Sequence, residues 1–501
     1  MSVNPILKGD FPDPDVIRVG DTYYMVSTTM HFMPGGVILR SYDLIHWEIA
    51  SHIYDKLDST KGQTLWGDSN IYGKGMWAAT IRYHNHTFYV VFVANDTGKT
   101  YLYTAQNVEG PWKKQNIKGF YHDCSLLFDE NRVFLVYGGT QIHLTELKSD
   151  LSGPKEGGLN RVIIKETGKY TLGYEGAHIY KINRKYYVFL IHSPGYGWFR
   201  TQAAFVSDSL EGEFRGRDVL RDDIGYRNQG VAQGGIVDTP DGEWYGILFQ
   251  DRGAVGRIPV LVPVTWKDDF PVFGIGGKVP ETIVTKSTRP DYKYKPLYSS
   301  DDFHYPDNGE QNVKLKDVWE FNHEPDSRLW SVTQRPGAYR IQSGKISESL
   351  EQAVNTLTQR MKFPGCEIIV TLDGSQLKPG DYAGLCALQG CFGLIGMKRE
   401  EWGRYLVMIG RQEGDQGKEY ARIPINQETV TLKLVANFQQ MKDEAEFYYL
   451  SGSEWKKLGI TQKLYFKLDH FTGCRAGLYL YSTKQTGGIA DFMDFQYHYT
   501  D

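Results

Sequence analysis

One unit recurs five times between residues 13 and 245, and this repeat constrains the fold more than any other feature of the chain. Each copy is a short apolar strand, a polar turn and a second strand led by aromatic residues. The first copy is Val16-Ile17-Arg18-Val19 followed by Tyr23-Tyr24-Met25-Val26, and the other first strands begin at Thr80, Ser125, His178 and Gly235. Five sheet-forming repeats of this length predict a five-bladed β-propeller, whose first strands line a central axis.

The rest of the chain predicts a second domain, because 501 residues are too many for one core. We expect the propeller to cover residues 1–290 and a linker rich in Pro, Asp, Ser and Tyr to cover 291–310. Residues 311–501 alternate between apolar and polar positions, which predicts a β-sandwich of the jelly-roll or concanavalin-like type and an all-β protein. The linker lacks a flexible Gly/Ser stretch, so the sandwich should pack on the propeller and help shape its pocket, with Phe471 as a contributor.

Composition narrows the possible partners. A net charge of -4 argues against nucleic acid, and no apolar run is long enough for a membrane span. The start of the chain has no secretory signal, and five cysteines without metal spacing indicate reduced thiols, so we expect a cytoplasmic protein. The 14% aromatic content suits either sugar stacking or ordinary strand packing. The sequence does not predict the oligomeric state.

The same position of each repeat carries a candidate functional group. Counting back ten or eleven residues from each second strand leads to Asp13, Trp77, Asp123, Glu175 and Gln233. Three carboxylates on one axis suit glycoside hydrolysis, with one as base, one as acid and a third that tunes the acid. Their mutual repulsion would keep one of them protonated near neutral pH. The alternatives are that the two aspartates cap turns and that Glu175 forms a surface salt bridge.

The residues around these acids resemble glycoside hydrolase family 43, the five-bladed propellers that remove arabinofuranosyl or xylosyl units. The resemblance rests on residues 4–15, 76–82, 122–126, 175–181 and 256–259, and on 355–360 and 381–385 in the second half. It implies that Asp13 is the general base, Asp123 the acid that tunes and orients, and Glu175 the general acid. These implied roles agree with the register of the repeats.

The resemblance also implies residues that bind substrate. Trp77 would form a wall of the sugar pocket, and Arg257 would approach the tuning acid or the bound sugar. The alternatives are inter-blade packing for Trp77 and a structural ion pair for Arg257. The loop of residues 28–36 should overhang the pocket and offer Phe32 as a sugar contact, and Tyr196-Gly197-Trp198-Phe199 should do likewise in the fourth blade. Either loop could instead serve blade packing.

No cofactor is expected for the chemistry, but a structural Ca²⁺ is considered. Many relatives carry a histidine near an axial calcium ion where this chain has Gln233, which can contribute only a neutral oxygen to a hard cation. Asp302 and Asp494 are candidate ligands for a calcium ion in the sandwich.

We therefore predict an exo-acting, inverting glycosidase that uses hemicellulose-derived oligosaccharides. The Met30–Gly35 loop most resembles arabinofuranosidase branches, which favours release of terminal α-L-arabinofuranosyl units from arabinoxylan-derived oligosaccharides. The alternatives are a β-D-xylosidase acting on xylo-oligosaccharides, a carbohydrate-binding propeller without chemistry, and a propeller that binds proteins.

Overall fold

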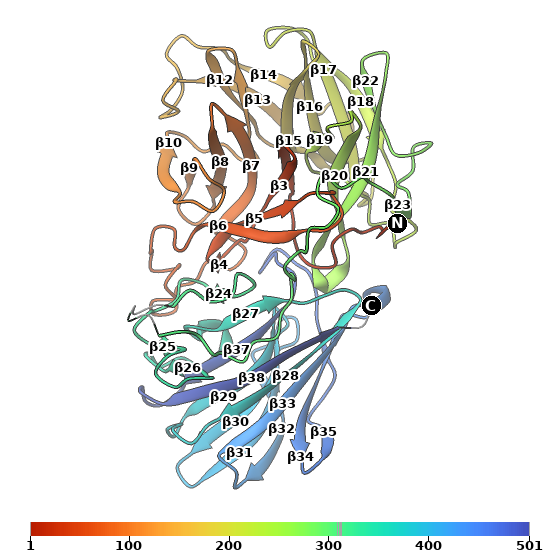
Figure 1. Ribbon diagram of the computed structural model, residues 1–501. Coiled ribbons are helices and arrows are strands. Elements are labelled where there is room, and N and C mark those ends of the chain that lie inside the picture. The colour runs from red at the N-terminus through yellow and green to blue at the C-terminus, as the bar shows by residue number, and fades with distance from the viewer. Residues whose placement is uncertain (1, 308, 310–312, 500–501) are drawn as a thin grey trace.

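The computed structural model describes residues 2–307, 309 and 313–499, and these form two stacked bodies (Figure 1). The upper body in the figure is a five-bladed propeller and the lower body is a β-sandwich, so the predicted all-β fold is confirmed. Within the described ranges, helical structure is limited to three short 3-10 segments, Gly253–Val255, Leu350–Gln352 and Gln439–Met441. No helix there is long and apolar enough to cross a membrane.

Each blade is a four-stranded antiparallel sheet, and the predicted repeat supplies its first two strands. Alternating apolar and aromatic residues form these strands because both faces of a blade are covered by neighbours. The strands are β2 Asp15–Val19, β3 Thr22–Ser27, β5 Gly35–Ser41 and β6 Glu48–Tyr54; β7 Met76–His84, β8 Thr87–Ala94, β9 Lys99–Ala105 and β10 Lys113–Ile117; β11 Ser125–Asp129, β12 Arg132–Tyr137, β13 Gln141–Leu147 and β14 Asn160–Lys165; β15 Tyr170–Ile182, β16 Lys185–Pro194, β17 Thr201–Ser207 and β18 Arg215–Leu220; and β19 Ile236–Asp238, β20 Trp244–Asp251, β21 Arg257–Lys267 and β22 Phe270–Phe273.

The innermost strands meet around the axis at a buried ion pair. Asp15 is fully buried and accepts hydrogen bonds from Arg82 Nη1 (2.7 Å) and from the backbone N–H of Ile81 (2.9 Å). The other amino group of Arg82 donates to Ser125 Oγ (2.8 Å) and to the Ile179 carbonyl (3.1 Å). One carboxylate and one guanidinium therefore join blades 1, 2, 3 and 4 at the centre of the propeller.

Polar contacts close the ring between the first and last blades. The Asn4 side chain donates to the Leu261 carbonyl (2.8 Å) and accepts from the Leu261 N–H (3.0 Å). Arg18 of blade 1 pairs with Asp238 of blade 5 at 2.6 Å. A two-stranded sheet of β1 Ser2–Val3 and β23 Thr282–Ile283 adds to this closure. The two ends of the propeller sequence are thus fastened to each other.

The sandwich consists of two antiparallel sheets whose inner faces form one core. Two-residue alternation along its long strands places apolar side chains inside and polar ones outside, as in Gly365–Asp373. Its strands are β24 Glu320–Asn322, β25 Trp330–Ser331, β26 Tyr339–Gln342, β27 Leu357–Arg360, β28 Gly365–Asp373, β29 Asp381–Leu388, β30 Gly393–Glu400, β31 Gly403–Gly410, β32 Lys418–Ile425, β33 Thr429–Asn437, β34 Glu444–Ser451, β35 Glu454–Lys457, β36 Gln462–Lys463, β37 Arg475–Ser482 and β38 Ile489–Tyr499.

The two bodies share a polar and apolar junction. The short propeller strand β4, Phe32–Met33, pairs with β24 and so extends one sheet of the sandwich. Beside it, buried Glu320 forms ion pairs with Arg360 (2.8 Å) and Arg475 (2.9 Å). Asp10 of the propeller accepts hydrogen bonds from the backbone N–H groups of Arg257 and Gly473, each at 2.8 Å. These contacts fix the sandwich over one end of the propeller axis.

Candidate active site

The backbone departs from regular strand geometry wherever the repeat delivers its functional residue. Asp13, Asp123 and Gln233 all have left-handed backbone angles, with φ of 51°, 49° and 58°. Non-glycine residues adopt this conformation at an energetic cost, so it is retained where the surroundings require it. Trp77 and Glu175 instead lie where the register of the first two strands shifts. Left-handed backbone angles and register shifts both change the direction of a side chain at the start of an inner strand.

Asp13 lies buried beside a guanidinium. Arg257 Nη1 donates a 2.8 Å hydrogen bond to Asp13 Oδ1, and both side chains are at most 8% exposed. Burial raises the pKa of Asp13 to about 6, because Arg257 offsets only part of the desolvation and the nearby charge of Asp123 adds to it. Asp13 can therefore hold a proton transiently near neutral pH, as a general base must.

Asp123 and Glu175 form a close pair of carboxyl groups. The ligand atoms of His122, Asp123 and Glu175 all lie within 4.8 Å of one another. Asp123 Oδ2 accepts a 3.1 Å hydrogen bond from the N–H of Gly176, which fixes it beside Glu175. Burial and then the charge of Asp123 raise the pKa of Glu175 to about 7, against the opposing charges of His122 and Arg200. Glu175 is thereby suited to donate a proton at neutral pH.

Trp77 and Arg257 both present unused hydrogen-bond donors in this region. Trp77 Nε1 is buried, as are Arg257 Nε and Nη2, and none of these atoms has a hydrogen-bond partner among the described residues. Buried donors without partners are costly, and ligand hydroxyl groups are one means of satisfying them. Arg257 contacts Asp13, the predicted base, whereas the sequence predicted that it would approach the tuning acid or the bound sugar.

The sandwich contributes an aromatic side chain to the same site. The Phe471 ring lies 5.4 Å from the Trp77 ring, and the Arg257 guanidinium lies 4.3 Å from the Phe471 ring, both measured to centroids. Its loop is anchored where the N–H of Cys474 donates to the Ala254 carbonyl at 2.8 Å. The sequence-based expectation that Phe471 helps to shape the pocket agrees with this position.

Two residues of the site escaped the sequence reasoning. Arg200 is 8% exposed, lies 2.9 Å from Asp251 (Nε to Oδ2), and its charge acts on both Asp13 and Glu175. His122 lies next to Asp123 and its ring is 5.9 Å from that of Trp77. The only available signal for His122 was its place beside a predicted acid, and Arg200 had none, because its approach to the acids depends on the path of the loop before β17.

The structure does not support Phe32 as a sugar contact. Its side chain is 1% exposed and packs with sandwich residues such as Leu350 and Tyr479. The Arg475 guanidinium covers its ring at 4.1 Å. Phe32 belongs to β4, which pairs with the sandwich, so the ring serves the domain junction. Sequence reasoning assigned the loop to the pocket because it could not foresee this pairing.

The metal predictions receive no structural support at the axis. Calcium prefers carboxylate oxygens, and the axial carboxylate of Asp15 is already paired with Arg82, so Asp15 is not free to bind a cation. Gln233 is buried and its N–H donates to Gln202 Oε1 at 2.7 Å. Asp302 and Asp494 are exposed in the sandwich and remain predictions. Over the described ranges, the sole convergence of three such ligands is that of His122, Asp123 and Glu175.

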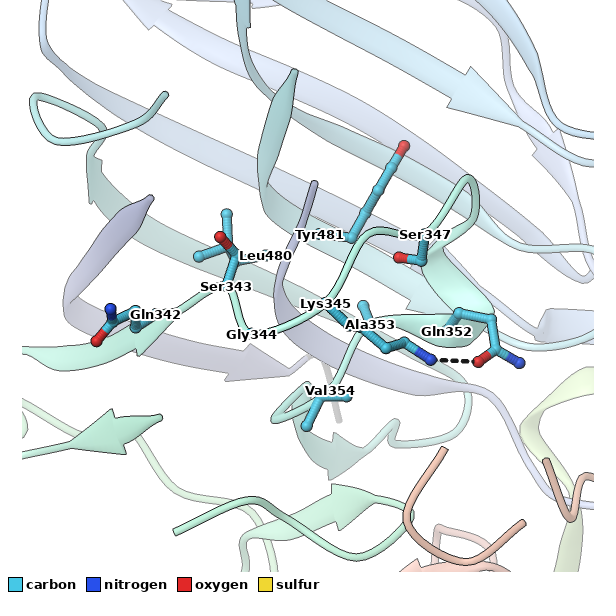
Figure 2. Close-up of a pocket in the computed structure, with 10 residues that line it drawn as sticks. All are labelled: Gln342, Ser343, Gly344, Lys345, Ser347, Gln352, Ala353, Val354, Leu480 and Tyr481. Atoms are coloured by element: carbon cyan, nitrogen blue, oxygen red, sulfur yellow. Dashed lines mark hydrogen bonds between the residues drawn. The ribbon is translucent and has the colours of Figure 1, made fainter. Parts of the chain in front are cut away.

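A separate hollow in the sandwich, shown in Figure 2, is too small for a sugar. Its free volume is about 10 Å³, which is room for one water. Lys345 there donates to Gln352 Oε1 at 2.6 Å, and also to the carbonyls of Leu65 and Gly67 from the propeller. This hollow is therefore part of the joint between the two bodies.

The arrangement can carry out hydrolysis at a sugar's anomeric carbon. It combines a carboxyl group with a pKa near 6, another near 7 and a third acid between them in the chain. Unpartnered donors and aromatic faces surround these groups, as expected of a site for a hydroxylated ring.

Comparison with known proteins leads to the same chemistry. The profile described as glycosyl hydrolases family 43 matches residues 2–271, and one described as a beta xylosidase C-terminal concanavalin A-like domain matches residues 310–498. A beta-xylosidase of Formosa agariphila is 28% identical, over 99% of this chain and 90% of its own. A non-reducing end alpha-L-arabinofuranosidase of Bacteroides ovatus is also 28% identical, over 71% of this chain and 68% of its own.

A solved structure supports this assignment over the full length. A protein described as a bifunctional GH43-CE of Bacteroides eggerthii has a TM-score of 0.93 and 41% identity, and it covers 100% of this chain. This chain spans 64% of that longer protein. Because the family profile covers more than half of the chain and the matched residues form a five-bladed propeller, this protein belongs to glycosyl hydrolase family 43.

Proposed function

We propose that this protein is an exo-acting, inverting β-D-xylosidase that releases terminal xylosyl units from xylan-derived oligosaccharides. The observation that carries this proposal is the pair of buried carboxyl groups with different environments. Asp13 lies against Arg257 and Glu175 lies against Asp123, so the two acids have separate roles near neutral pH.

In the proposed mechanism the two acids act on opposite faces of the sugar. Asp13 takes a proton from a water molecule, whose oxygen attacks the anomeric carbon as the glycosidic bond breaks. Glu175 gives its proton to the departing oxygen, so that charge is balanced in one step. The charge of Asp123 keeps Glu175 protonated, and the Gly176 N–H holds Asp123 in place. Inversion of the anomeric configuration follows from direct attack by water.

The position of the sandwich loop supports exo-action. Phe471 meets Trp77 and Arg257 from the side of the second domain and so limits the room for sugar units there. A closed side of this kind favours a substrate that enters by one terminal unit. The unpartnered N–H groups of Arg257 and Trp77 are suited to the hydroxyl groups of that unit.

The choice of xylose over arabinose revises the preference derived from the sequence. That preference depended on the Met30–Gly35 loop, and Phe32 of this loop is buried in the domain junction. Several relatives are named beta-xylosidase, and the one from Formosa agariphila aligns with 99% of this chain, whereas one relative is named alpha-L-arabinofuranosidase and aligns with 71% of it. We therefore rank β-D-xylosidase first and α-L-arabinofuranosidase second.

The test is a comparison of kcat/KM on nitrophenyl β-D-xylopyranoside and nitrophenyl α-L-arabinofuranoside, with Asp13→Asn as the inactive control. The proposal predicts higher kcat/KM on the xyloside. A higher value on the arabinofuranoside would reverse the ranking, and no cleavage of either compound or of xylo-oligosaccharides would reject the proposed function.

A further inference from the structure

Blade 4 carries a group of exposed aromatic side chains at one of its ends. Tyr196 is 86% exposed, and Trp198 and Tyr170 are each 44% exposed. Tyr170 begins β15 and lies opposite Pro194, the last residue of β16, while the other two lie in the loop that follows. Three large exposed rings at one strand hairpin are informative because folding normally buries such side chains.

This end of blade 4 is the end that holds Glu175. Glu175 pairs with Ile191 of β16, which in turn pairs with Gln202 of β17. Trp198 precedes Gln202 by only four residues, in the loop that leads into β17. Four residues span at most about 14 Å. The aromatic group therefore lies at the same end of blade 4 as the general acid.

Arg200 links the aromatic group to the catalytic carboxyl groups. Its guanidinium lies 5.1 Å from the centroid of the Trp198 ring and 4.9 Å from that of Phe249. Arg200 Nε also lies 2.9 Å from Asp251 Oδ2, Asp251 lies opposite Arg257 in the sheet of blade 5, and Arg257 pairs with Asp13. Trp198 is therefore connected to Asp13 through Arg200, Asp251 and Arg257.

The loop that carries these rings is held in place by several contacts. The N–H of Gly195 donates to the Lys169 carbonyl at 2.6 Å, and Lys169 Nζ lies 5.0 Å from the centroid of the Tyr196 ring. Arg221 donates to Thr201 Oγ1 at 3.1 Å at the other end of the loop. Aromatic faces that are fixed before binding lose little conformational freedom when a ligand arrives.

The position of this group relates it to the leaving part of a substrate. A general acid protonates the oxygen that departs, so the leaving group must lie on the side of Glu175. Phe471 and Trp77 come from the sandwich and blade 2, and they meet Arg257 beside Asp13. The exposed rings of blade 4 lie instead on the strand hairpin that bears Glu175.

We propose that Trp198 and Tyr196, together with Tyr170, form a platform that binds the sugar units beyond the cleaved bond. Aromatic rings stack on the apolar faces of pyranose units, so the ligand is the chain that remains after the terminal unit leaves. This inference rests on the proposed function and adds a preference for substrates with several sugar units on the leaving side.

The test compares variants on short and long substrates. Trp198→Ala and Tyr196→Ala are assayed for kcat/KM on a nitrophenyl glycoside and on a linear oligosaccharide of six units of the same sugar. Trp402→Ala is the matched control, because Trp402 is 99% exposed in the sandwich turn between β30 and β31. The ratio of long-substrate to short-substrate kcat/KM should fall by about tenfold in each platform variant, the equivalent of about 1.4 kcal/mol, and stay unchanged in the control.

Trp198→Ala can move Arg200 and so lower kcat/KM on every substrate. The ratio of long-substrate to short-substrate kcat/KM is not changed by such a general loss. Tyr196→Ala is the second variant because it does not touch Arg200. An unchanged ratio in both platform variants would overturn the platform while leaving the proposed hydrolase intact. A wild-type protein inert on every glycoside would instead reject the proposed function. A similar fall in the ratio for Trp402→Ala would also overturn the platform, because any exposed tryptophan would then have the same effect.

Discussion

Arg257 donates a hydrogen bond of 2.8 Å to Asp13, and both side chains are buried at the start of the central axis. Burial alone would push the pKa of Asp13 upward, and the guanidinium limits the rise to about 6. The same arginine keeps its Nε and Nη2 without partners in the described part of the chain. One side chain can therefore set the charge of the base and bind the sugar.

The pH dependence of kcat/KM should be bell-shaped, with limbs near 6 and 7. Asp13 must be ionised to accept a proton, so activity falls as the pH drops through about 6. Glu175 must be protonated to donate one, so activity falls as the pH rises through about 7. A pH profile on a natural oligosaccharide, whose leaving alcohol needs a proton, measures both limbs. A kcat/KM that stays constant from pH 5 to 8 would contradict these pKa values for Asp13 and Glu175.

Removing the positive charge beside Asp13 should shift one limb only. In Arg257→Met the carboxylate loses its partner, so the pKa of Asp13 rises and the acidic limb moves to higher pH. Arg257→Lys retains a charge and should shift that limb less, although it also loses the fixed guanidinium geometry. Acidic limbs at the same pH in wild type and Arg257→Met would mean that Arg257 does not tune the base.

Glu175→Gln should stabilise the protein, and more so at higher pH. The folded-state pKa of Glu175 is raised from 4.5 to about 7, so its ionisation penalises folding increasingly as the pH rises between these values and fully above 7. The penalty is about 3–4 kcal/mol. Thermal melts of wild type and variant should coincide near pH 4 and differ by several degrees near pH 8. A difference that shrinks with rising pH would contradict the assignment.

The axial ion pair should matter more for stability than a similar pair at the rim. Arg82→Ala leaves Asp15 charged and buried, which should cost about 3–5 kcal/mol. The control is Arg18→Ala, because the Arg18–Asp238 pair is partly exposed and should cost less than about 1 kcal/mol. Urea unfolding of both variants measures the difference. Equal losses of unfolding free energy in the two variants would show that the Arg82–Asp15 pair stabilises the protein no more than the Arg18–Asp238 pair does.

The sequence was sufficient for features that depend on local pattern. The strands of the propeller follow from short-range alternation, and a fixed count within the repeat located Asp13, Asp123 and Glu175 at or just before the inner strands of blades 1, 3 and 4. It could not place Phe32, because the strand that pairs with Phe32 lies about 290 residues further along the chain. It also missed Arg200, whose approach to the acids is set by the loop before β17 and not by any repeat.

The division of labour between Asp13 and Glu175 is tested most directly by their responses to the leaving group. Glu175→Gln cannot donate a proton, so it should lose most activity on natural oligosaccharides and retain far more on an activated nitrophenyl glycoside, whose leaving group departs without one. Asp13→Asn should fail on both substrates, and azide should restore part of its turnover by attacking the anomeric carbon directly. Equal losses on the two substrates for Glu175→Gln would contradict the account, because Glu175 would then not be the acid.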